Sequence, residues 1–377
     1  MKFNLAEEIN ITVNDSYKEK ITSISSQNGL YIGREDGFMD AFCKNDKYTV
    51  ECFTKEYDLL ENEHIKEGIT AIEKYETHNI DDRMFVSNER AIKIMQIKPI
   101  RSVREILNEN YSDDEKFAVG AKIFNSAGKP RVFQHLFSVE KKLPNAHKYL
   151  INSLSLSMGQ EFLISSDLLK TNLWKPDRMD VYYNLIDIKP EISQGNIYVL
   201  TTAEFSKYRD AVFGFATSTG NILLQDARIN TRSSNFAVLE NYKRGSSIKS
   251  ISDFKFIDEN RIASRNLNTI TIYDIRNPTR KVFDQILFKE TSTVVGSDLM
   301  YEKFKLAAYD DFIITGSTNS SIYFINTLNE KIEEIKIENH TEKQNSLVKF
   351  VSVNKDGFYC CVNKTIYRYS ENNEQTK

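Results

Sequence analysis

The stretch that decides the fold is Arg261-Ile-Ala-Ser-Arg-Asn-Leu-Asn-Thr-Ile-Thr-Ile-Tyr273. A short apolar segment is followed by a turn of small polar residues and then by a second segment rich in β-branched and aromatic side chains. Alternating polarity on both sides of such a turn is typical of two antiparallel strands. The stretch is therefore interpreted as a β-hairpin.

Seven copies of this pattern follow one another along the chain. They occupy residues 30–42, 84–95, 162–174, 212–224, 261–273, 312–324 and 357–369. Most copies lie roughly 40–55 residues apart, close to the period of propeller blades. Asp226 and Asp274 follow two of the hairpins where WD repeats carry their Trp-Asp signature. The sequence thus predicts an all-β, seven-bladed β-propeller of the WD-repeat type. We expect it to be a single domain over residues 1–377, with a strand near residues 20–25 completing the last blade.

Composition limits the classes of protein to which the chain can belong. Of its 377 residues 40% are hydrophobic, including 19 Tyr and 23 Phe, which is enough to build a core and excludes wholesale disorder. The formal net charge of −3 gives no reason to expect nucleic acid or an anionic membrane as a partner. No apolar run is long enough to span a bilayer.

The cysteines and the first residues indicate a reducing compartment. Cys43, Cys52, Cys360 and Cys361 show no CxxC spacing, and two of them are adjacent, which suits a disulfide framework poorly. The first residues lack the apolar core of a signal peptide. We expect a cytoplasmic protein, and the sequence leaves open whether part of it is nuclear.

An insertion of residues 97–144 interrupts the repeat between the second and third copies. It contains its own hairpin pattern, with residues 117–124 and 131–139 on either side of a turn-rich stretch. A lone hairpin cannot bury both of its faces, so exposed phenylalanines would mark an interface. These are Phe117, Phe124, Phe133 and Phe137. The alternative is a long loop that folds back on its own domain.

No residue pattern points to catalysis. The sequence holds no glycine-rich phosphate loop and no HExxH, and its five histidines are not paired at metal-ligand spacing. Residues 216–220 resemble a nucleophile elbow but lack its first glycine and lie between two predicted strands. Solvated charge explains the acidic clusters at 56–58 and 113–115. We therefore expect no catalytic residue, no metal and no cofactor, and a platform for binding.

Two longer stretches resemble a known family. Asn145-Ala-His-Lys-Tyr-Leu-Ile-Asn-Ser-Leu-Ser-Leu-Ser157 resembles the Asn-Ala-His-x-Tyr-His-Ile-Asn-Ser-Ile-Ser signature of the WD-repeat B-type regulatory subunits of protein phosphatase 2A. Glu56-Tyr-Asp-Leu-Leu-Glu-Asn-Glu-His-Ile-Lys-Glu-Gly-Ile69 is similar to the family's second signature, Glu-Phe-Asp-Tyr-Leu-Lys-Ser-Leu-Glu-Ile-Glu-Glu-Lys-Ile. Shorter matches follow in the same order at 184–190, 202–205, 247–256 and 315–317. The resemblance covers nearly the whole chain and weakens after about Tyr323.

The resemblance implies a non-catalytic regulatory subunit. Members of this family join a HEAT-repeat scaffold subunit and a two-metal catalytic subunit in a heterotrimer. A hairpin arm from the second blade grips the scaffold, and the insertion 97–144 lies where that arm is expected. The four phenylalanines would then bind the scaffold. An acidic groove on the top face captures phosphoprotein substrates through the basic segments that flank the phosphorylated residue.

The groove residues carry over only in part. Tyr149 matches a groove tyrosine, but Leu150 replaces the histidine that follows it. A pair of aspartates in the family aligns with Asp167 and Leu168, so one carboxylate is missing, which weakens selection of basic substrates by ~1 kcal/mol. The predicted substrate-binding residues are Tyr149, Asp167, Leu168, Glu56 and Asp58. The alternative is that these residues hold the edges of blades, while Lys170 and Trp174 are expected to be structural.

Two other classes remain open on sequence alone. One is a general WD-repeat adaptor of a ubiquitin ligase or a trafficking complex, with a different partner on the arm. The other is a propeller enzyme, which the missing acid–base and metal patterns disfavour.

Overall fold

The structure is a computed structural model. It describes residues 3–10, 21–26, 29–43, 46–59, 62–75, 82–99, 135–189, 198–229, 237–240, 249–287, 302–337, 347–354, 357–362 and 365–371. The chain divides into two compact units. Unit 2 is Thr22–Leu154, and unit 1 combines Met1–Ile21 with Ser155–Lys377.

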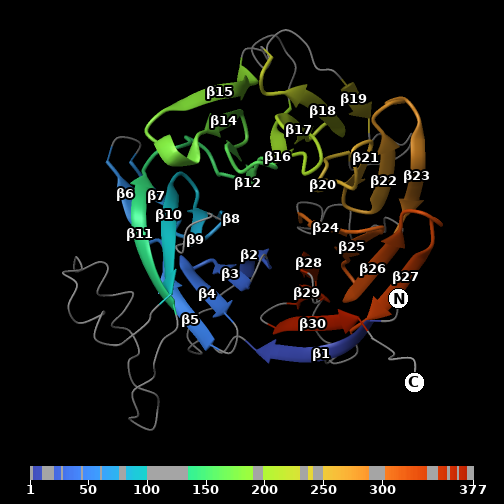
Figure 1. Ribbon diagram of the computed structural model, residues 1–377, viewed down its shortest axis with the longest axis horizontal. Coiled ribbons are helices and arrows are strands. Elements are labelled where there is room, and N and C mark those ends of the chain that lie inside the picture. Colours follow the sequence, from blue (N-terminus) through green and yellow to red (C-terminus); the bar gives the residue numbers. More distant parts are fainter. Residues whose placement is uncertain are drawn as a thin grey trace. The chain divides into compact units, whose positions relative to one another are not determined.

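Two four-stranded antiparallel sheets and one short hairpin belong to unit 2 (Figure 1). The first sheet is β2 (Ile21–Ser25), β3 (Leu30–Arg34), β4 (Phe38–Cys43) and β5 (Asp46–Glu51). The second sheet is β8 (Ala71–Tyr75), β9 (Asp82–Ser87), β10 (Ile92–Pro99) and β11 (His135–Leu143). The hairpin is β6 (Glu56–Asp58) and β7 (Glu63–Ile65), which pair only with each other among the described strands.

Unit 1 supplies the other five four-stranded sheets. The third sheet, which begins at the boundary between the units, is β12 (Ser153–Leu156), β13 (Leu163–Ser166), β14 (Lys170–Trp174) and β15 (Tyr182–Asp187), with the 3-10 turn η1 (Pro176–Arg178) before β15. The fourth is β16 (Leu200–Phe205), β17 (Val212–Thr217), β18 (Asn221–Asp226) and β19 (Ala237–Glu240). The fifth is β20 (Asp253–Phe256), β21 (Arg261–Arg265), β22 (Thr269–Asp274) and β23 (Lys281–Ile286). The sixth is β24 (Leu306–Tyr309), β25 (Phe312–Gly316), β26 (Ser321–Asn326) and β27 (Ile332–Lys336).

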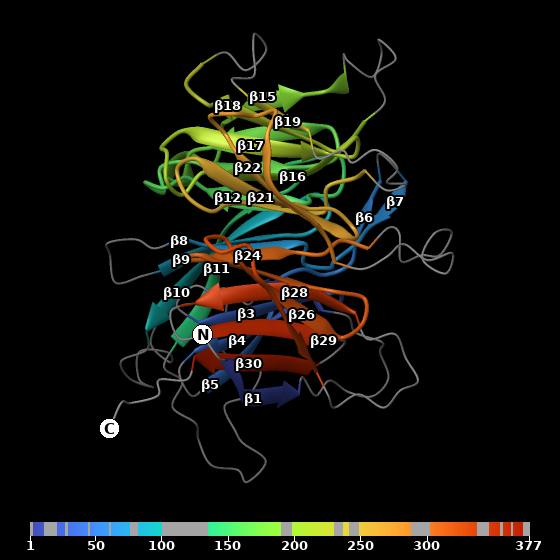
Figure 2. The same ribbon diagram turned by 90° about the vertical axis from the view of Figure 1, so that its right-hand side faces the viewer.

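The seventh sheet combines segments from opposite ends of the sequence. Its strand order is β1 (Phe3–Asn10), β30 (Thr365–Glu371), β29 (Gly357–Val362) and β28 (Val348–Asn354). Phe3 pairs with Glu371 and Asn10 with Thr365, and both views show β1 beside β30 (Figure 2). The prediction that a strand near residues 20–25 completes the last blade is wrong. Those residues form β2, the first strand of the first sheet, and residues 3–10 pair with the edge of β30 in their place.

Seven four-stranded antiparallel sheets confirm the predicted fold class, the seven-bladed β-propeller. Each of the seven predicted hairpins forms the second and third strands of one sheet. Several of these strands, such as β13 and β17, are buried along their whole length, whereas the fourth strand β27 is mostly exposed. This explains why the inner hairpins were visible in the sequence and the outer strands were not: long β-branched and aromatic runs belong to strands buried on both faces.

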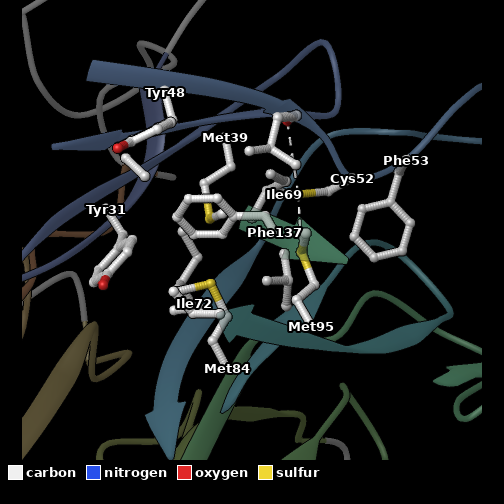
Figure 3. Packing of buried hydrophobic residues seen from close by; sticks show 14 of the residues in the cluster. Tyr31, Met39, Tyr48, Cys52, Phe53, Ile69, Ile72, Met84, Met95 and Phe137 are labelled. Carbon is white, nitrogen blue, oxygen red and sulfur yellow. Dashed lines mark hydrogen bonds between the residues drawn. The ribbon is translucent and has the colours of Figure 1, made fainter. Parts of the chain in front are cut away.

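The core of unit 2 lies between its two sheets (Figure 3). Met39 from β4, Met84 from β9 and Met95 from β10 pack together there, and the thiol of Cys52 lies 3.5 Å from the sulfur of Met95. Phe137 from β11 belongs to the same cluster and packs against Tyr48 with ring centroids 5.6 Å apart. Flexible methionines are well suited to fill an irregular space between two packed sheets.

In unit 1, charged pairs connect the first strands of neighbouring sheets. Among the described residues, each junction from the fourth sheet to the seventh carries an ion pair between residues that lie on or ahead of strands β16, β20, β24 and β28. The pairs are Glu204–Lys255, Asp253–Lys305 and Glu302–Lys349. Asp253 also accepts a 2.9 Å hydrogen bond from the backbone N–H of Leu306 in β24. Because these carboxylates sit where sheets meet, they help to fix the register between sheets.

Candidate functional site

The turn between β9 and β10 is the structural centre of the candidate site in unit 2. The N–H of Asn88 donates to the carbonyl of Ala91, and the side-chain oxygen of Asn88 accepts from the N–H groups of Arg90 and Ala91 at 3.0 and 2.7 Å. An asparagine that bonds its own following backbone in this way holds a tight turn. The turn fixes the backbone of Arg90, from which the side chain extends towards the hairpin β6–β7.

Arg90 anchors the hairpin through two carboxylates. Its guanidinium contacts Asp58 at 2.8 Å and Glu63 at 2.7 Å, and only 10% of the Arg90 side chain is exposed. Asp58 and Glu63 are paired directly across the two strands, so both carboxylates face the same side. A planar guanidinium presents donors in a fork that suits two acceptors at once. The hairpin β6–β7 is therefore attached to the second sheet by charge-assisted hydrogen bonds.

A second basic residue, Lys142 in β11, makes an ion pair with Glu56 at the start of the hairpin. Glu56 and Asp58, both predicted to read substrate charge, are therefore already paired with cations inside unit 2. On the opposite face of the hairpin, the rings of Tyr57 and His64 meet edge to face with centroids 4.9 Å apart, and Tyr57 is 46% exposed. Leu59, next to the turn, is 85% exposed.

The second signature-like segment meets the same turn. The N–H of His147 donates to the carbonyl of Arg90, and that of Ile151 donates to the carbonyl of Glu89. His147 and Ile151 are buried, whereas Tyr149 and Leu150 between them are exposed. Residues 56–69 and 145–157 are far apart in the sequence, but both bind residues 89–90. We call this arrangement, formed by Arg90, Asp58, Glu63, His147 and Ile151, the Arg90 cluster.

Asp167 and Leu168 lie in unit 1, at the turn between β13 and β14. Asp167 is 1% exposed, and its carboxylate accepts hydrogen bonds from the N–H groups of Leu169 and Lys170 at 2.6 and 2.7 Å. Asn88 holds the equivalent turn of the second sheet and Asn266 that of the fifth, through the same contacts. Asp167 thus holds a turn, in agreement with the structural alternative, and its part in substrate binding stays a prediction. Leu168 is half-buried.

The two residues expected to be structural are so. Trp174 is 3% exposed and its indole N–H donates to the hydroxyl of Ser165 at 2.8 Å. Lys170 makes a 3.1 Å ion pair with Asp187 on the neighbouring strand β15.

The predicted arm is described only at its two ends. Residues 97–99 belong to β10 and His135–Leu143 forms β11, which pairs with β10 along its whole length. Phe137 is 3% exposed in the core of unit 2, so the exposure predicted for it is wrong: in the register of β11 its side chain faces the first sheet. Phe117, Phe124 and Phe133 lie outside the described residues.

No group of three or more His, Cys, Asp or Glu that could hold a metal ion occurs among the described residues. Burial raises the pKa of the Cys52 and Cys361 thiols to about 12, so both remain protonated at neutral pH. Within the described chain, no helix has the length and apolar character needed to cross a membrane.

Sequence reasoning missed Arg90 and Lys142. The signal for Arg90 was the spacing of Asp58 and Glu63, which a hairpin turn brings to one face where two carboxylates need a shared cation. Nothing in the sequence identified Lys142 as the partner of Glu56, because the two lie on different elements.

Comparison with known proteins gives a consistent result. No protein-family model matches the chain. The regulatory B subunit of protein phosphatase PP2A from Candida tropicalis is 30% identical over 294 residues, which cover 73% of this chain and 58% of that protein. The PP2A 55 kDa regulatory subunit of Drosophila melanogaster is 28% identical, covering 72% of this chain and 58% of that protein. For the regulatory B subunit of PP2A from Schizosaccharomyces pombe the identity is 28%, with coverage of 71% and 63%.

The matched region therefore spans only about three fifths of each of these relatives. Among solved structures, Raptor of Chaetomium thermophilum matches with a TM-score of 0.60 at 10% identity, over 99% of this chain and 30% of that chain, and this likeness concerns the fold alone. The two segments that meet at the Arg90 cluster are those that resemble the phosphatase subunits in sequence. Over these residues the chain is thus similar in sequence to curated regulatory B subunits of protein phosphatase PP2A.

Proposed function

We propose that this chain is a non-catalytic regulatory subunit of a protein phosphatase 2A heterotrimer. One observation carries the proposal: two segments with the family's signatures, distant in sequence, bind the same turn at residues 89–90. A chance resemblance would give no reason for the two to meet. The names of the relatives, all regulatory subunits, agree with this role.

We propose that the insertion binds the HEAT-repeat scaffold subunit and that the scaffold brings the catalytic subunit. The ends of the insertion support a sharper boundary than residues 97–144, because β10 runs to Pro99 and β11 begins at His135. Removal of β11 would strip the second sheet of its fourth strand and the core of Phe137. A deletion of residues 101–133, closed by a short Gly-Ser linker, spares both strands.

The experiment is co-purification with tagged scaffold and catalytic subunits. The intact chain is expected to recover both, and the 101–133 deletion to recover neither. The triple variant Phe117→Asp, Phe124→Asp, Phe133→Asp should behave like the deletion, while Tyr208→Asp, at an exposed aromatic residue of unit 1, should bind normally. If the intact chain recovers neither subunit, a general adaptor role replaces the proposal. Purified chain alone is expected to hydrolyse no phosphoester.

We further propose that the chain recruits phosphoprotein substrates with less dependence on basic flanking residues than its relatives. Glu56 and Asp58 are paired with Lys142 and Arg90, Asp167 is buried, and Leu168 carries no charge. Tyr149 is 37% exposed and supplies an aromatic surface. The test compares binding of basic and neutral phosphopeptides by the assembled trimer. Lys142→Ala, which frees Glu56, should strengthen binding of the basic peptide alone, and equal effects on both peptides would exclude Glu56 from the binding surface.

A further inference from the structure

Strand β15, the fourth strand of the third sheet, exposes an unusual apolar surface. Val181, which directly precedes the strand, and Tyr182 and Tyr183 at its start are 60%, 51% and 68% exposed, and they are the only three consecutive large apolar residues that are exposed in the described part of the chain. Tyr182 and Tyr183 alternate across the strand. The ring of Tyr182 packs against Trp174 with centroids 4.9 Å apart and is half exposed, and Tyr183 on the other face is exposed. Soluble proteins seldom expose such a run unless it contacts a partner.

The backbone of β15 is also available at one edge. Its residues pair with β14, Tyr182 opposite Trp174 and Tyr183 opposite Leu173, and no other described strand pairs with it. A strand at the edge of a sheet presents a row of N–H and C=O groups to which a further strand can be added. The side chains and the backbone of β15 therefore favour the same kind of contact.

Charge, which commonly protects such edges, is missing from this one. Residues 181–186 carry no charged side chain, and Asp187 at the end of β15 is paired with Lys170. The outer strand β27 of the same unit shows the contrast, since its exposed central residues are Glu333 and Glu334. Charged residues on an exposed edge discourage pairing with another chain, so β27 is protected and β15 is not.

We propose that β15 is a self-association site, at which two copies of this chain join by antiparallel pairing of their β15 strands. A two-fold axis perpendicular to the sheet at Tyr183 sets Tyr183 opposite Tyr183 of the second copy and Tyr182 opposite Asn184, and aromatic pairs across strands are stabilising. No like charges meet in this register. The same operation at Glu333 of β27 would set that residue against Glu333 of the second copy, which is repulsive. The self-complementarity of β15 is the reason to favour a second copy over an unrelated partner.

The dimer is expected to be weak. A pair of short strands with their exposed tyrosines buries less than the roughly 1,200 Å² of a stable standard-size interface. Association should thus appear in the micromolar range or above and should be governed by a fast exchange between monomer and dimer.

The test uses the full-length chain in sedimentation velocity over a series of micromolar concentrations, together with hydrogen exchange at the lowest and highest of them. The weight-average sedimentation coefficient should rise with concentration, and exchange of the amides in residues 181–186 should slow at the high concentration. Tyr183→Lys places the new lysine of one copy opposite the same lysine of the second copy. This repulsion should weaken association about tenfold or more. The matched control is Val282→Lys on the outer strand β23, where Val282 is 42% exposed, and it should associate like the wild type.

Three results would overturn the proposal. The first is a sedimentation coefficient that does not change with concentration. The second is association that Tyr183→Lys leaves intact while the variant keeps the wild-type thermal unfolding. The third is association without protection of residues 181–186, which would assign the dimer to another surface. An added uncharged, extended peptide could protect these amides although the chain does not self-associate. That result would mean that the edge of β15 binds a different partner.

Discussion

The guanidinium of Arg90 contacts the carboxylate of Asp58 at 2.8 Å and thereby joins the hairpin β6–β7 to the turn that ends β9. Both side chains are mostly buried, with 10% and 15% of their surface exposed. The same turn receives residues 147 and 151 through its carbonyl groups. One arginine thus determines the position of two segments that resemble the phosphatase regulatory subunits, which makes it the most informative residue to change.

Replacement of Arg90 by Met should release the hairpin. Asp58 would lose its charge-assisted hydrogen bond in a mostly buried place, at a cost on the order of 1–3 kcal/mol, whereas Glu63, being largely exposed, should add little. Hydrogen exchange should accelerate in residues 56–65 more than in β9. The control is Arg228→Met, at an exposed ion pair with Asp226, which should leave the unfolding midpoint unchanged. Equal exchange in both variants would mean that Arg90 does not anchor the hairpin.

Two substitutions of Asp167 distinguish a role in stabilising its turn from a role that depends on the negative charge. Asparagine holds the equivalent turns at positions 88 and 266, so Asp167→Asn should keep the free energy of unfolding near that of the wild type. Asp167→Ala leaves two N–H groups without their acceptor and should cost roughly 1–3 kcal/mol. Urea unfolding measures both. If Asn destabilises as strongly as Ala, the negative charge itself matters.

Gly316 at the end of β25 allows β28 of the next sheet to approach. A Cβ at this position would lie 1.9 Å from the carbonyl oxygen of Val348, a backbone atom that cannot move alone. Gly316→Ala should therefore lower the free energy of unfolding by about 3 kcal/mol. Gly159→Ala is the matched control, because the nearest atom to its Cβ, on the side chain of Glu161, is 3.8 Å away. A mild effect of Gly316→Ala in thermal unfolding would contradict the close contact.

Arg265 in β21 is a buried cation with no carboxylate partner among the residues that the structure describes. Its side chain is fully buried, lies over the ring of Phe304, and donates through Nη2 to the carbonyl of Gly316 at 3.2 Å. Burial lowers its pKa to about 9, which means that the protein environment disfavours the charged form. Met, with a similar length and no charge, should leave the free energy of unfolding unchanged or raise it by about 1–2 kcal/mol.

The check on Arg265→Met is chemical unfolding beside Arg261→Met on the same strand. Arg261 makes an ion pair with Asp258 at the surface, so Arg261→Met should lower the free energy of unfolding slightly. A clear loss of stability in Arg265→Met would show that the hydrogen bond to Gly316 outweighs the cost of burying the charge.

Glu204 gives a pH dependence with a defined sign. Burial raises its pKa, and Lys255 only partly opposes the shift. The folded state therefore holds a proton that the unfolded state has lost, and this group's contribution to stability is lost as pH rises from the usual carboxyl range, about 4.3, through the folded pKa. Glu204→Gln should remove that slope, so the variant gains relative to the wild type as pH rises. The free energy of unfolding is measured at several pH values, with Glu333→Gln on the exposed strand β27 as the control. If it changes with pH in the same way in the wild type and in Glu204→Gln, Glu204 is not the source of the pH dependence.

The fold could be predicted in detail because its diagnostic parts are local. Each inner hairpin, such as residues 261–273, carries its apolar alternation and its turn within a dozen residues, and all seven were found. The outer strands could not be recognised, since strands such as β27 are mostly polar and gain their place only by pairing with a neighbour. The closing strand was missed for the same reason: the partner of Phe3–Asn10 lies at the other end of the sequence.

The candidate site was predictable only as a set of segments. The signature-like runs located residues 56–69 and 145–157, but not the side chains that join them. The sequence alone predicts Asp58 and Glu56 to be free acidic groups, because the cations that pair with them, Arg90 and Lys142, belong to other elements. Phe137 read as exposed because its place in the second sheet depends on the register with β10. Ion pairs and registers between distant elements are properties of the folded chain and are invisible to local patterns.

The pairing of β1 with β30 has a consequence for how the protein is made. During synthesis β1 leaves the ribosome well before β30. Its backbone N–H and C=O groups therefore stay unpaired until nearly all the other strands have emerged. Domains tend to fold as they appear, and unit 2 can do so early because its sequence is continuous. The last sheet cannot. A circular permutant that begins at β2 and carries β1 after β30 should make that sheet a local structure, and it should refold faster than the natural order of strands.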